Sequence, residues 1–130
     1  MESSHTRIGQ LGEQTVANHF KRRGYSIRDR NYRKKWGEID IIAEKMNVVH
    51  FIEVKTVSYE TRFPSVTHGT WLPEENVERR KLGRLFRIIE TWLSEYKYEG
   101  EWQLDVVSVW INSKHKTGRI KVIENVIKDI

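Results

Sequence analysis

Residues 37–43 and 51–55 constrain what this chain can fold into more than any other part of it. Both segments are rich in β-branched residues and carry charged residues at alternate positions, which is the pattern of a β-strand. The short stretch 44–47 lies between them and predicts that the two strands fold back on each other as a hairpin. The charged residues take positions at which an ordinary strand carries core residues, so they need a partner or a function.

The expected register of this hairpin brings two carboxylates together. With residues 46–47 as the turn, counting outward along both strands places Asp40 directly opposite Glu53. Directly opposed residues project from the same face with Cβ atoms about 5 Å apart, and two like charges at that distance destabilise a sheet unless a cation lies between them. Lys55 follows on the same face, two residues along the strand. Two carboxylates beside an ammonium group predict a divalent-metal site for phosphoester hydrolysis.

Two alternatives to this site stay open from the sequence. In the first, the hairpin face is exposed and its charged residues are only solvated or salt-bridged: Glu38, Asp40, Glu53 and Lys55. In the second, a one-residue change of register moves Asp40 opposite Ile52 and separates the pair. The Glu-x-Lys pattern is weak by itself, since it recurs at residues 95–97 in a predicted helix, where positions i and i+2 do not share a face.

A third carboxylate belongs to a predicted amphipathic helix over residues 8–23, which Gly24 ends in the position that favours glycine. On a period of 3.6 residues, Glu13 shares its stripe with Ala17 and Phe20 and therefore points toward the core side. A carboxylate there is unfavourable unless it is paired or bound to a metal. A salt bridge to an arginine is the alternative reading of Glu13.

The ligand types predict Mg²⁺ or Mn²⁺. Carboxylate and carbonyl oxygens suit these ions, and the carbonyl of Val54 is expected to add a ligand to Asp40, Glu53 and Glu13. A zinc site is not expected, because the chain has no cysteine and its histidines show no ligand spacing. These histidines are His5, His19, His50, His68 and His115.

At 130 residues, the chain is expected to form one domain over residues 1–130, long enough for a single hydrophobic core. It has no apolar run near 18 residues, and residues 1–5 are polar, so neither a transmembrane helix nor a signal peptide is expected. The absence of cysteine agrees with a cytoplasmic protein. No membrane partner is predicted.

The net charge of +5 is unevenly distributed. Residues 21–35 contain eight basic residues and one acidic residue, Asp29, so the rest of the chain carries a slightly negative net charge. The basic residues are Lys21, Arg22, Arg23, Arg28, Arg30, Arg33, Lys34 and Lys35. Such a concentration, with Tyr25, Tyr32 and Trp36 nearby, is typical of a polyanion-binding surface. A solvated basic loop is the alternative.

Residues 25–31 are expected to form a first strand that leads into this basic loop. A long loop over residues 56–72 would leave directly from Lys55 and cover a substrate. A helix should start at Pro73, with a second basic face that lies opposite its apolar stripe. The stripe, read as plain core, consists of Leu82, Leu85, Phe86, Ile89, Trp92, Leu93 and Tyr96, and the basic face of Arg79, Arg80, Lys81, Arg84 and Arg87. An ordinary charged helix surface is the alternative for that face.

A strand over residues 101–111, a turn over residues 114–118 and a last strand over residues 119–126 complete the expected elements. Asp105 stands between Leu104 and Val106 in an otherwise apolar strand. It is expected to be either a polar residue that supports the site from behind or a charge on an edge strand.

With these residues in hand, the chain resembles the YraN-type family of small bacterial proteins, a part of the restriction-endonuclease-like PD-(D/E)xK group that is related to Holliday-junction resolvases. The matching residues are Gly9, Gly12, Glu13, Ala17, Gly24, Tyr25, Asn31, Arg33, Gly37, Glu38, Ile39, Asp40, Glu53, Val54, Lys55, Lys81 and Asp105. The resemblance implies an α/β fold with a mixed central sheet flanked by helices, in the order αβββαβ. It also implies that Glu13, Asp40 and Glu53 are metal ligands and that Lys55 is the catalytic lysine.

The chain departs from the pattern of this family at three places. Ile39 replaces the proline that names the wider group, Val57 stands where a basic residue is usual, and residues 62–72 differ from the usual Arg-Phe-Gly pattern. These departures concern contacts with substrate more than the binding of a metal.

We therefore expect a metal-dependent endonuclease that hydrolyses phosphodiester bonds in DNA, including branched or junction DNA. The expected nucleic-acid contacts are Arg28, Arg30, Arg33, Lys34, Lys35, Lys81 and Arg84. The alternatives are a nucleic-acid-binding module that does not cleave and an interaction protein whose charged faces meet an acidic partner. Resolvase relatives act as two-fold dimers, which makes a homodimer plausible here.

Overall fold

The computed structural model describes residues 4–59, 79–112, 114 and 117–127. Their elements are α1 (Ser4–Arg22), β1 (Ser26–Lys34), β2 (Gly37–Lys45), β3 (Val48–Tyr59), α2 (Arg79–Glu95), β4 (Glu101–Asn112) and β5 (Thr117–Ile123). The strands form one mixed sheet in the order β1-β2-β3-β4-β5. Only β3 and β4 pair in parallel, and α2 lies between them in the chain. The predicted order αβββαβ is thus observed, with the expected last strand at its end.

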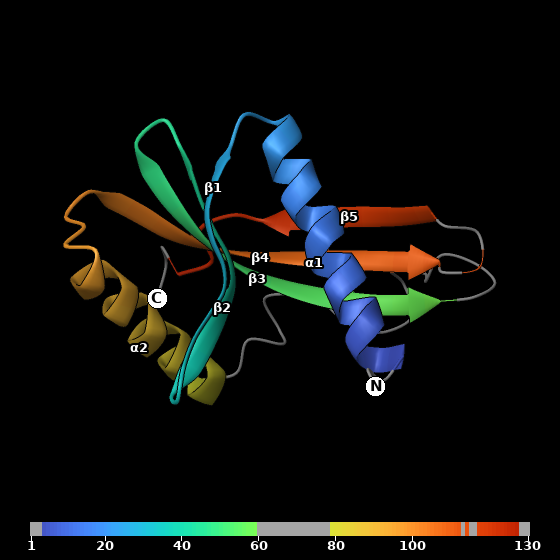
Figure 1. The fold of residues 1–130 in the computed structure, drawn as a ribbon, viewed down its shortest axis with the longest axis horizontal. Helices are drawn as coiled ribbons and strands as arrows, with labels where there is room; N and C mark the ends of the chain where they lie inside the picture. Colours follow the sequence, from blue (N-terminus) through green and yellow to red (C-terminus); the bar gives the residue numbers. More distant parts are fainter. Residues whose placement is uncertain (1–3, 60–78, 113, 115–116, 128–130) are drawn as a thin grey trace.

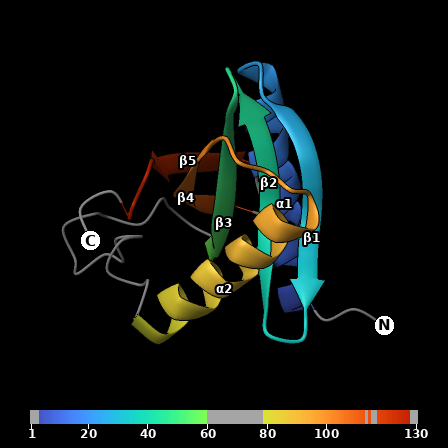
Figure 2. The same cartoon turned by 90° about the vertical axis from the view of Figure 1, so that its left-hand side faces the viewer.

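The two helices cover opposite faces of the sheet, as Figures 1 and 2 show. On one face Val16 and Phe20 of α1 pack in the same cluster as Ile52 of β3. On the other face Ile89 and Trp92 of α2 belong to a second cluster with residues of β2, β3 and β4. Central strands covered on both faces carry nearly continuous apolar runs, which explains why β4 shows little alternation.

Helix α1 ends as the sequence predicts. Gly24 has a φ of +88°, and the chain closes on the helix through two main-chain bonds. The N–H of Gly24 donates to the carbonyl of Lys21, and the N–H of Tyr25 donates to the carbonyl of Phe20, each at 3.0 Å. This pair of bonds is a Schellman motif, in which glycine takes the left-handed position at no steric cost. The helix starts at Ser4, four residues before the predicted start.

The β2–β3 hairpin has the predicted register. Its main-chain pairs run from Lys45 opposite Val48 to Ile41 opposite Ile52. The turn residues, Met46 and Asn47, have φ values of 52° and 66°. A two-residue turn with both central φ values positive matches the right-handed twist of the paired strands. The alternative register, in which the two carboxylates are separated, is therefore wrong.

Strands β1 and β3 both extend into segments that were predicted as loops. Strand β1 runs to Lys34, so Arg33 and Lys34 lie in a strand because β2 pairs with them there. Strand β3 continues to Tyr59, because its parallel pairing with β4 extends to Asn112. The expected loop over residues 60–72 and the expected helix start over residues 73–78 lie outside the described residues.

Two predictions for the later elements also need correction. Tyr96, which the predicted apolar stripe included, follows the end of α2 and is 49% exposed. Ile88, which the predicted stripe did not include, is fully buried. The last strand, β5, spans residues 117–123 rather than 119–126. Among the helices in the described part of the chain, none is long and apolar enough to cross a membrane.

Asp105 is not an edge-strand charge, because β4 lies between β3 and β5 and the side chain is fully buried. One of its carboxylate oxygens lies 2.7 Å from Nδ1 of His50. The other accepts hydrogen bonds from the side-chain amide of Gln103 and from the main-chain N–H of Asn125. Asp105 therefore ties the segment after β5 to the centre of the sheet.

Gly12 sets how closely α1 approaches β3. A Cβ atom at this position would lie 2.8 Å from Cγ2 and 2.9 Å from Cβ of Thr56, closer than real carbon contacts allow. Gly9, one turn earlier in α1, has no atom within 4 Å of the same construction. The two glycines therefore differ in their surroundings although they share a helix.

We expect Gly12→Ala to lower the free energy of unfolding by about 1–3 kcal/mol, because the helix must move away from Thr56. Gly9→Ala is the matched control and should raise stability by about 0.5–1 kcal/mol through helix propensity. Urea unfolding of both variants measures the difference. Equal effects of the two substitutions would contradict the close contact at Gly12.

Candidate active site

Asp40 and Glu53 lie at the point where β2 and β3 separate. The main-chain pairs of the hairpin end at Ile41 and Ile52, one residue short of both carboxylates. There the N–H of Val54 donates to Oδ2 of Asp40 at 2.7 Å, so a side chain replaces a main-chain acceptor. The N–H and C=O of one residue in a strand point to the same side. The carbonyl of Val54 therefore also faces the gap beside Asp40.

The two carboxyl groups line the same cavity, and each residue is only partly exposed to water. Burial, followed by the negative charge of Glu53, raises the pKa of Asp40 to about 8. Burial also raises the pKa of Glu53, against the opposing effect of Lys81 and Lys55. Both shifts favour the protonated form of the pair, because two adjacent carboxylates that are poorly exposed to water do not both ionise readily.

Two lysines accompany the pair. The ammonium group of Lys81 lies 3.4 Å from Oε1 of Glu53, and the Glu53 side chain is 12% exposed. The nearby amino group of Lys81, followed by burial, lowers the pKa of Lys55. The predicted convergence of Asp40, Glu53 and Lys55 is observed, whereas the placement of Lys81 on an outer basic face is wrong.

Lys81 reaches Glu53 because α2 packs close to the start of β2. A Cβ atom on Gly37 would lie 3.4 Å from the carbonyl oxygen of Arg84 and 3.4 Å from Cβ of Ile88. At these distances the backbone of Gly37 lies directly against α2, with room for no more than a Cβ atom in ordinary contact. This approach closes a cavity of about 360 Å³. Its charged lining consists of Glu38, Asp40, Glu53, Lys81 and Arg84.

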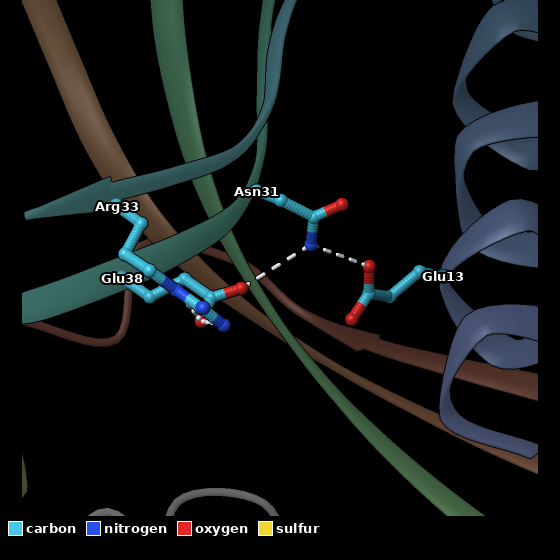
Figure 3. A network of polar contacts seen from close by, with 4 residues as sticks. All are labelled: Glu13, Asn31, Arg33 and Glu38. Atoms are coloured by element: carbon cyan, nitrogen blue, oxygen red, sulfur yellow. Dashed lines mark hydrogen bonds and ion pairs between the residues drawn. The ribbon is translucent and has the colours of Figure 1, made fainter. Parts of the chain in front are cut away.

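Glu13 lines a neighbouring cavity of about 500 Å³, which also contains Asn31 and Arg33. Glu38 belongs to both cavities and joins them. Figure 3 shows that the Asn31 amide lies between Glu13 and Glu38. The negative charge of Glu13 is near enough to contribute to the raised pKa of Asp40. Glu13 accepts a hydrogen bond from this amide at 2.8 Å. The alternative prediction, a salt bridge between Glu13 and an arginine, is therefore not what the structure shows.

The donor set at Asp40, Glu53 and the carbonyl of Val54 fits Mg²⁺ or Mn²⁺, which prefer carboxylate and carbonyl oxygens. A divalent ion would also relieve the repulsion that now retains a proton on the buried pair. Among the described residues, no three Asp, Glu or His side chains are grouped closely enough to hold a metal. The structure therefore brings two of the three expected carboxylates together and places Glu13 in the next cavity.

The predicted basic surface is divided between the two faces of the sheet, because a register shift and the left-handed Asn31 interrupt the alternation of β1. Arg30 bonds to a residue of α1, whereas Lys34 pairs with a residue of α2. The residues of this surface bond within the protein: Arg28 with Glu44, Arg30 with Gln14, Arg33 with Glu38 and Lys34 with Glu95. Tyr32, expected near a polyanion, is 7% exposed and donates its hydroxyl to Glu95 at 2.6 Å. Of the expected contacts, Arg33, Lys81 and Arg84 line the two cavities.

Sequence reasoning assigned no role to Asn31, although its φ of 51° and its two carboxylate partners place it at the centre of the second cavity. Asparagine tolerates the left-handed region better than most residues. An asparagine inside a strand of charged and β-branched residues is the signal that could have indicated an irregular position.

A family model described as "Uncharacterised protein family UPF0102" matches residues 12–109, a stretch that contains all four predicted site residues, Glu13, Asp40, Glu53 and Lys55. The chain belongs to the UPF0102 family. The predicted membership of the YraN-type family is thereby confirmed.

Relatives from distant bacteria cover nearly the whole chain. A UPF0102 protein of Moorella thermoacetica is 38% identical over 125 residues, which are 95% of this chain and 98% of the relative. One from Corynebacterium efficiens is 39% identical over 114 residues, which are 86% of this chain and 84% of the relative. One from Clostridium botulinum strain 657 is 34% identical over 120 residues, 91% of each chain.

The raised pKa of Asp40 predicts how stability depends on pH without a metal. Between its ordinary value near 4 and the native value of about 8, the native state holds a proton that the unfolded state has released. Stability should therefore fall as pH rises from 5 to 8. Asp40→Asn removes this titration and should flatten the slope.

Urea unfolding in the presence of EDTA, at several pH values, measures both slopes. Glu90→Gln, which neutralises an exposed carboxylate on α2, is the control and should keep the slope of the wild type. Parallel slopes for the wild type and Asp40→Asn would contradict the raised pKa.

Proposed function

We propose that this protein is a divalent-metal-dependent nuclease that hydrolyses phosphodiester bonds in DNA, with Mg²⁺ or Mn²⁺ held by Asp40 and Glu53. One observation carries the proposal: two partly buried carboxyl groups line the same cavity where β2 and β3 separate, and the main-chain N–H of Val54 binds one of them. If the Lys81–Glu53 pair had only a structural role, it would require neither a second carboxylate beside it nor the end of main-chain pairing at this point of the hairpin.

The arrangement also supports a restriction-endonuclease-like fold. Asp40 on one strand of a hairpin, Glu53 and Lys55 on the other, and Glu13 on a preceding helix follow the resemblance of the sequence to that group. The mixed sheet with a parallel β3–β4 pair and helices on both faces agrees with it. On this basis the proposal includes the assignment of the observed order αβββαβ to the restriction-endonuclease-like group.

The residues have separate roles in the proposed reaction. A bound divalent ion supplies charge neutralisation at the phosphate and lowers the pKa of a coordinated water. Asp40 and Glu53 hold the ion, with the carbonyl of Val54 as a further oxygen donor. Nζ of Lys55 stands beside them and stabilises negative charge that develops on phosphate oxygens or orients the attacking water. The hydrogen bond from Val54 to Asp40 keeps one carboxylate oxygen in a fixed direction.

Arginine and lysine side chains around the cavity favour a polyanionic substrate. Arg84 is exposed at the lining of the Asp40–Glu53 cavity, and Arg33 is exposed at the lining of the next one. Their positions would bring a phosphate backbone across both cavities. DNA, including branched or junction DNA, is the proposed substrate, and a two-fold dimer remains part of the proposal through the resemblance to resolvases.

A nucleic-acid-binding module that does not cleave is the second candidate. Two observations favour it: Lys81 already contacts Glu53, and the described residues contain no group of three metal-binding side chains. In that case Lys81 would be a permanent partner of Glu53. Only a metal-dependent loss of substrate separates the two candidates.

The test is a single-turnover cleavage assay with Mg²⁺ and Mn²⁺ on labelled duplex, single-stranded and four-way-junction DNA. We expect cleavage by the wild type and a loss of at least about a hundredfold in rate for Lys55→Ala, because its charge acts where negative charge develops. Binding measured with Ca²⁺ should change little in this variant.

Lys21→Ala is the matched control, since Lys21 is exposed at the far end of α1, and it should cleave like the wild type. If wild type and Lys55→Ala bind equally and neither cleaves any substrate, the binding module replaces the nuclease.

Arg84 should contribute to DNA affinity through a phosphate contact. Arg84→Ala is expected to weaken binding at low salt and to reduce the slope of log affinity against log salt by about 0.9, the value for one lost phosphate contact. Arg22→Ala, at the exposed C-terminal end of α1, should leave the slope unchanged. Fluorescence anisotropy at several salt concentrations measures both. Identical slopes for Arg84→Ala and the wild type would place the DNA elsewhere.

A further inference from the structure

Asn31 interrupts strand β1 beside the proposed metal site. Its φ of 51° lies in the left-handed region, although it stands in the middle of the strand. The neighbouring pairs, Arg30 with Ile41 and Tyr32 with Ile39, place Asn31 next to Asp40 on β2. An asparagine can hold this conformation at a smaller energetic penalty than other residues with a side chain.

The side-chain amide of Asn31 joins two carboxylates from different elements. Its Nδ2 atom donates to Glu13 of α1 at 2.8 Å and to Glu38 of β2 at 3.3 Å. Figure 3 shows the amide between the two carboxylates, while Arg33 bonds to the other carboxylate oxygen of Glu38. Asn31 therefore links Glu13 of α1 to the β1–β2 strands.

The two carboxylates differ in the charge of the group that each one contacts. Glu38 accepts two hydrogen bonds from the guanidinium group of Arg33, at 3.2 and 2.9 Å, which neutralise its charge. Glu13 is held by a neutral amide, which fixes its direction without adding a positive charge. A carboxylate that is oriented but not neutralised can still attract a cation, whereas an arginine partner would compete with that cation.

We propose that Asn31 is a positioning residue that fixes the Glu13 carboxylate in the cavity next to the Asp40–Glu53 pair, so that Glu13 attracts the divalent ion from there and binds it through water. This inference rests on the proposed function, which supplies the ion. It gives Glu38 no part in holding the ion, since Arg33 neutralises the charge of Glu38.

Because Asn31 has a positive φ, its side chain can be removed by substitution with glycine without straining the backbone. Asn31→Gly removes the amide and keeps a residue that adopts a positive φ readily. Asn47 offers a matched control, because it has a φ of 66° in the β2–β3 turn and lines neither of the two cavities. Asn47→Gly therefore makes the same chemical change at a similar backbone conformation.

The experiment is a calorimetric titration of Mn²⁺ into the metal-free full-length protein and these variants. Asn31→Gly should weaken Mn²⁺ binding by about tenfold or more, the range observed when residues that orient metal ligands are removed. Asn47→Gly should bind Mn²⁺ like the wild type. Urea unfolding without metal shows that both variants are folded, so that a loss of affinity is not a loss of structure.

A double-mutant cycle tests whether Asn31 acts through Glu13. In a Glu13→Gln background, Asn31→Gly should change Mn²⁺ affinity by less than about twofold, because the group that it positions no longer carries a charge. An equal loss in both backgrounds, or an equal effect of Asn31→Gly and Asn47→Gly, would overturn the role of Asn31 and leave the proposed function standing. A wild type that binds no Mn²⁺ would overturn the proposed function and this inference with it.

Discussion

The hydrogen bond from the N–H of Val54 to Asp40 is the interaction on which the rest of the site depends. It satisfies a main-chain donor where β2 no longer pairs with β3, and it holds the carboxylate in the cavity that Glu53 also lines. Two acidic groups in such a place are unfavourable unless protons or cations compensate them. The raised pKa of Asp40 and the contact between Lys81 and Glu53 are the consequences in the metal-free protein.

Two glycines then decide which helices reach the pair from opposite faces of the sheet. Gly12 lets α1 lie against Thr56 of β3, so that Glu13 faces the second cavity. Gly37 lets α2 lie close to β2, so that Lys81 and Arg84 line the first cavity. A larger residue at Gly12 would move α1 away from β3, and the second cavity would lose one of its walls while the hairpin stayed intact.

The parts of the fold that could be predicted are those with local causes. The register of the hairpin follows from a two-residue turn and the count along each strand, and the end of α1 follows from Gly24. The extents of β1 and β3 could not be predicted, because pairing with a neighbouring strand, distant in sequence for β3, holds their polar ends in the sheet. The basic segment was predicted as one surface, but the irregular strand β1 divides it between two faces of the sheet.

For the candidate site, the sequence by itself determined the Asp40–Glu53 pair and the neighbouring Lys55, because residues on two connected strands keep a countable register. Only the tertiary structure decided that Lys81 contacts Glu53 and that an amide, Asn31, lies between Glu13 and Glu38. Both contacts join elements whose relative rotation and distance depend on packing across the sheet. No spacing along the chain encodes that geometry, since it arises from the close approach of each helix at a glycine.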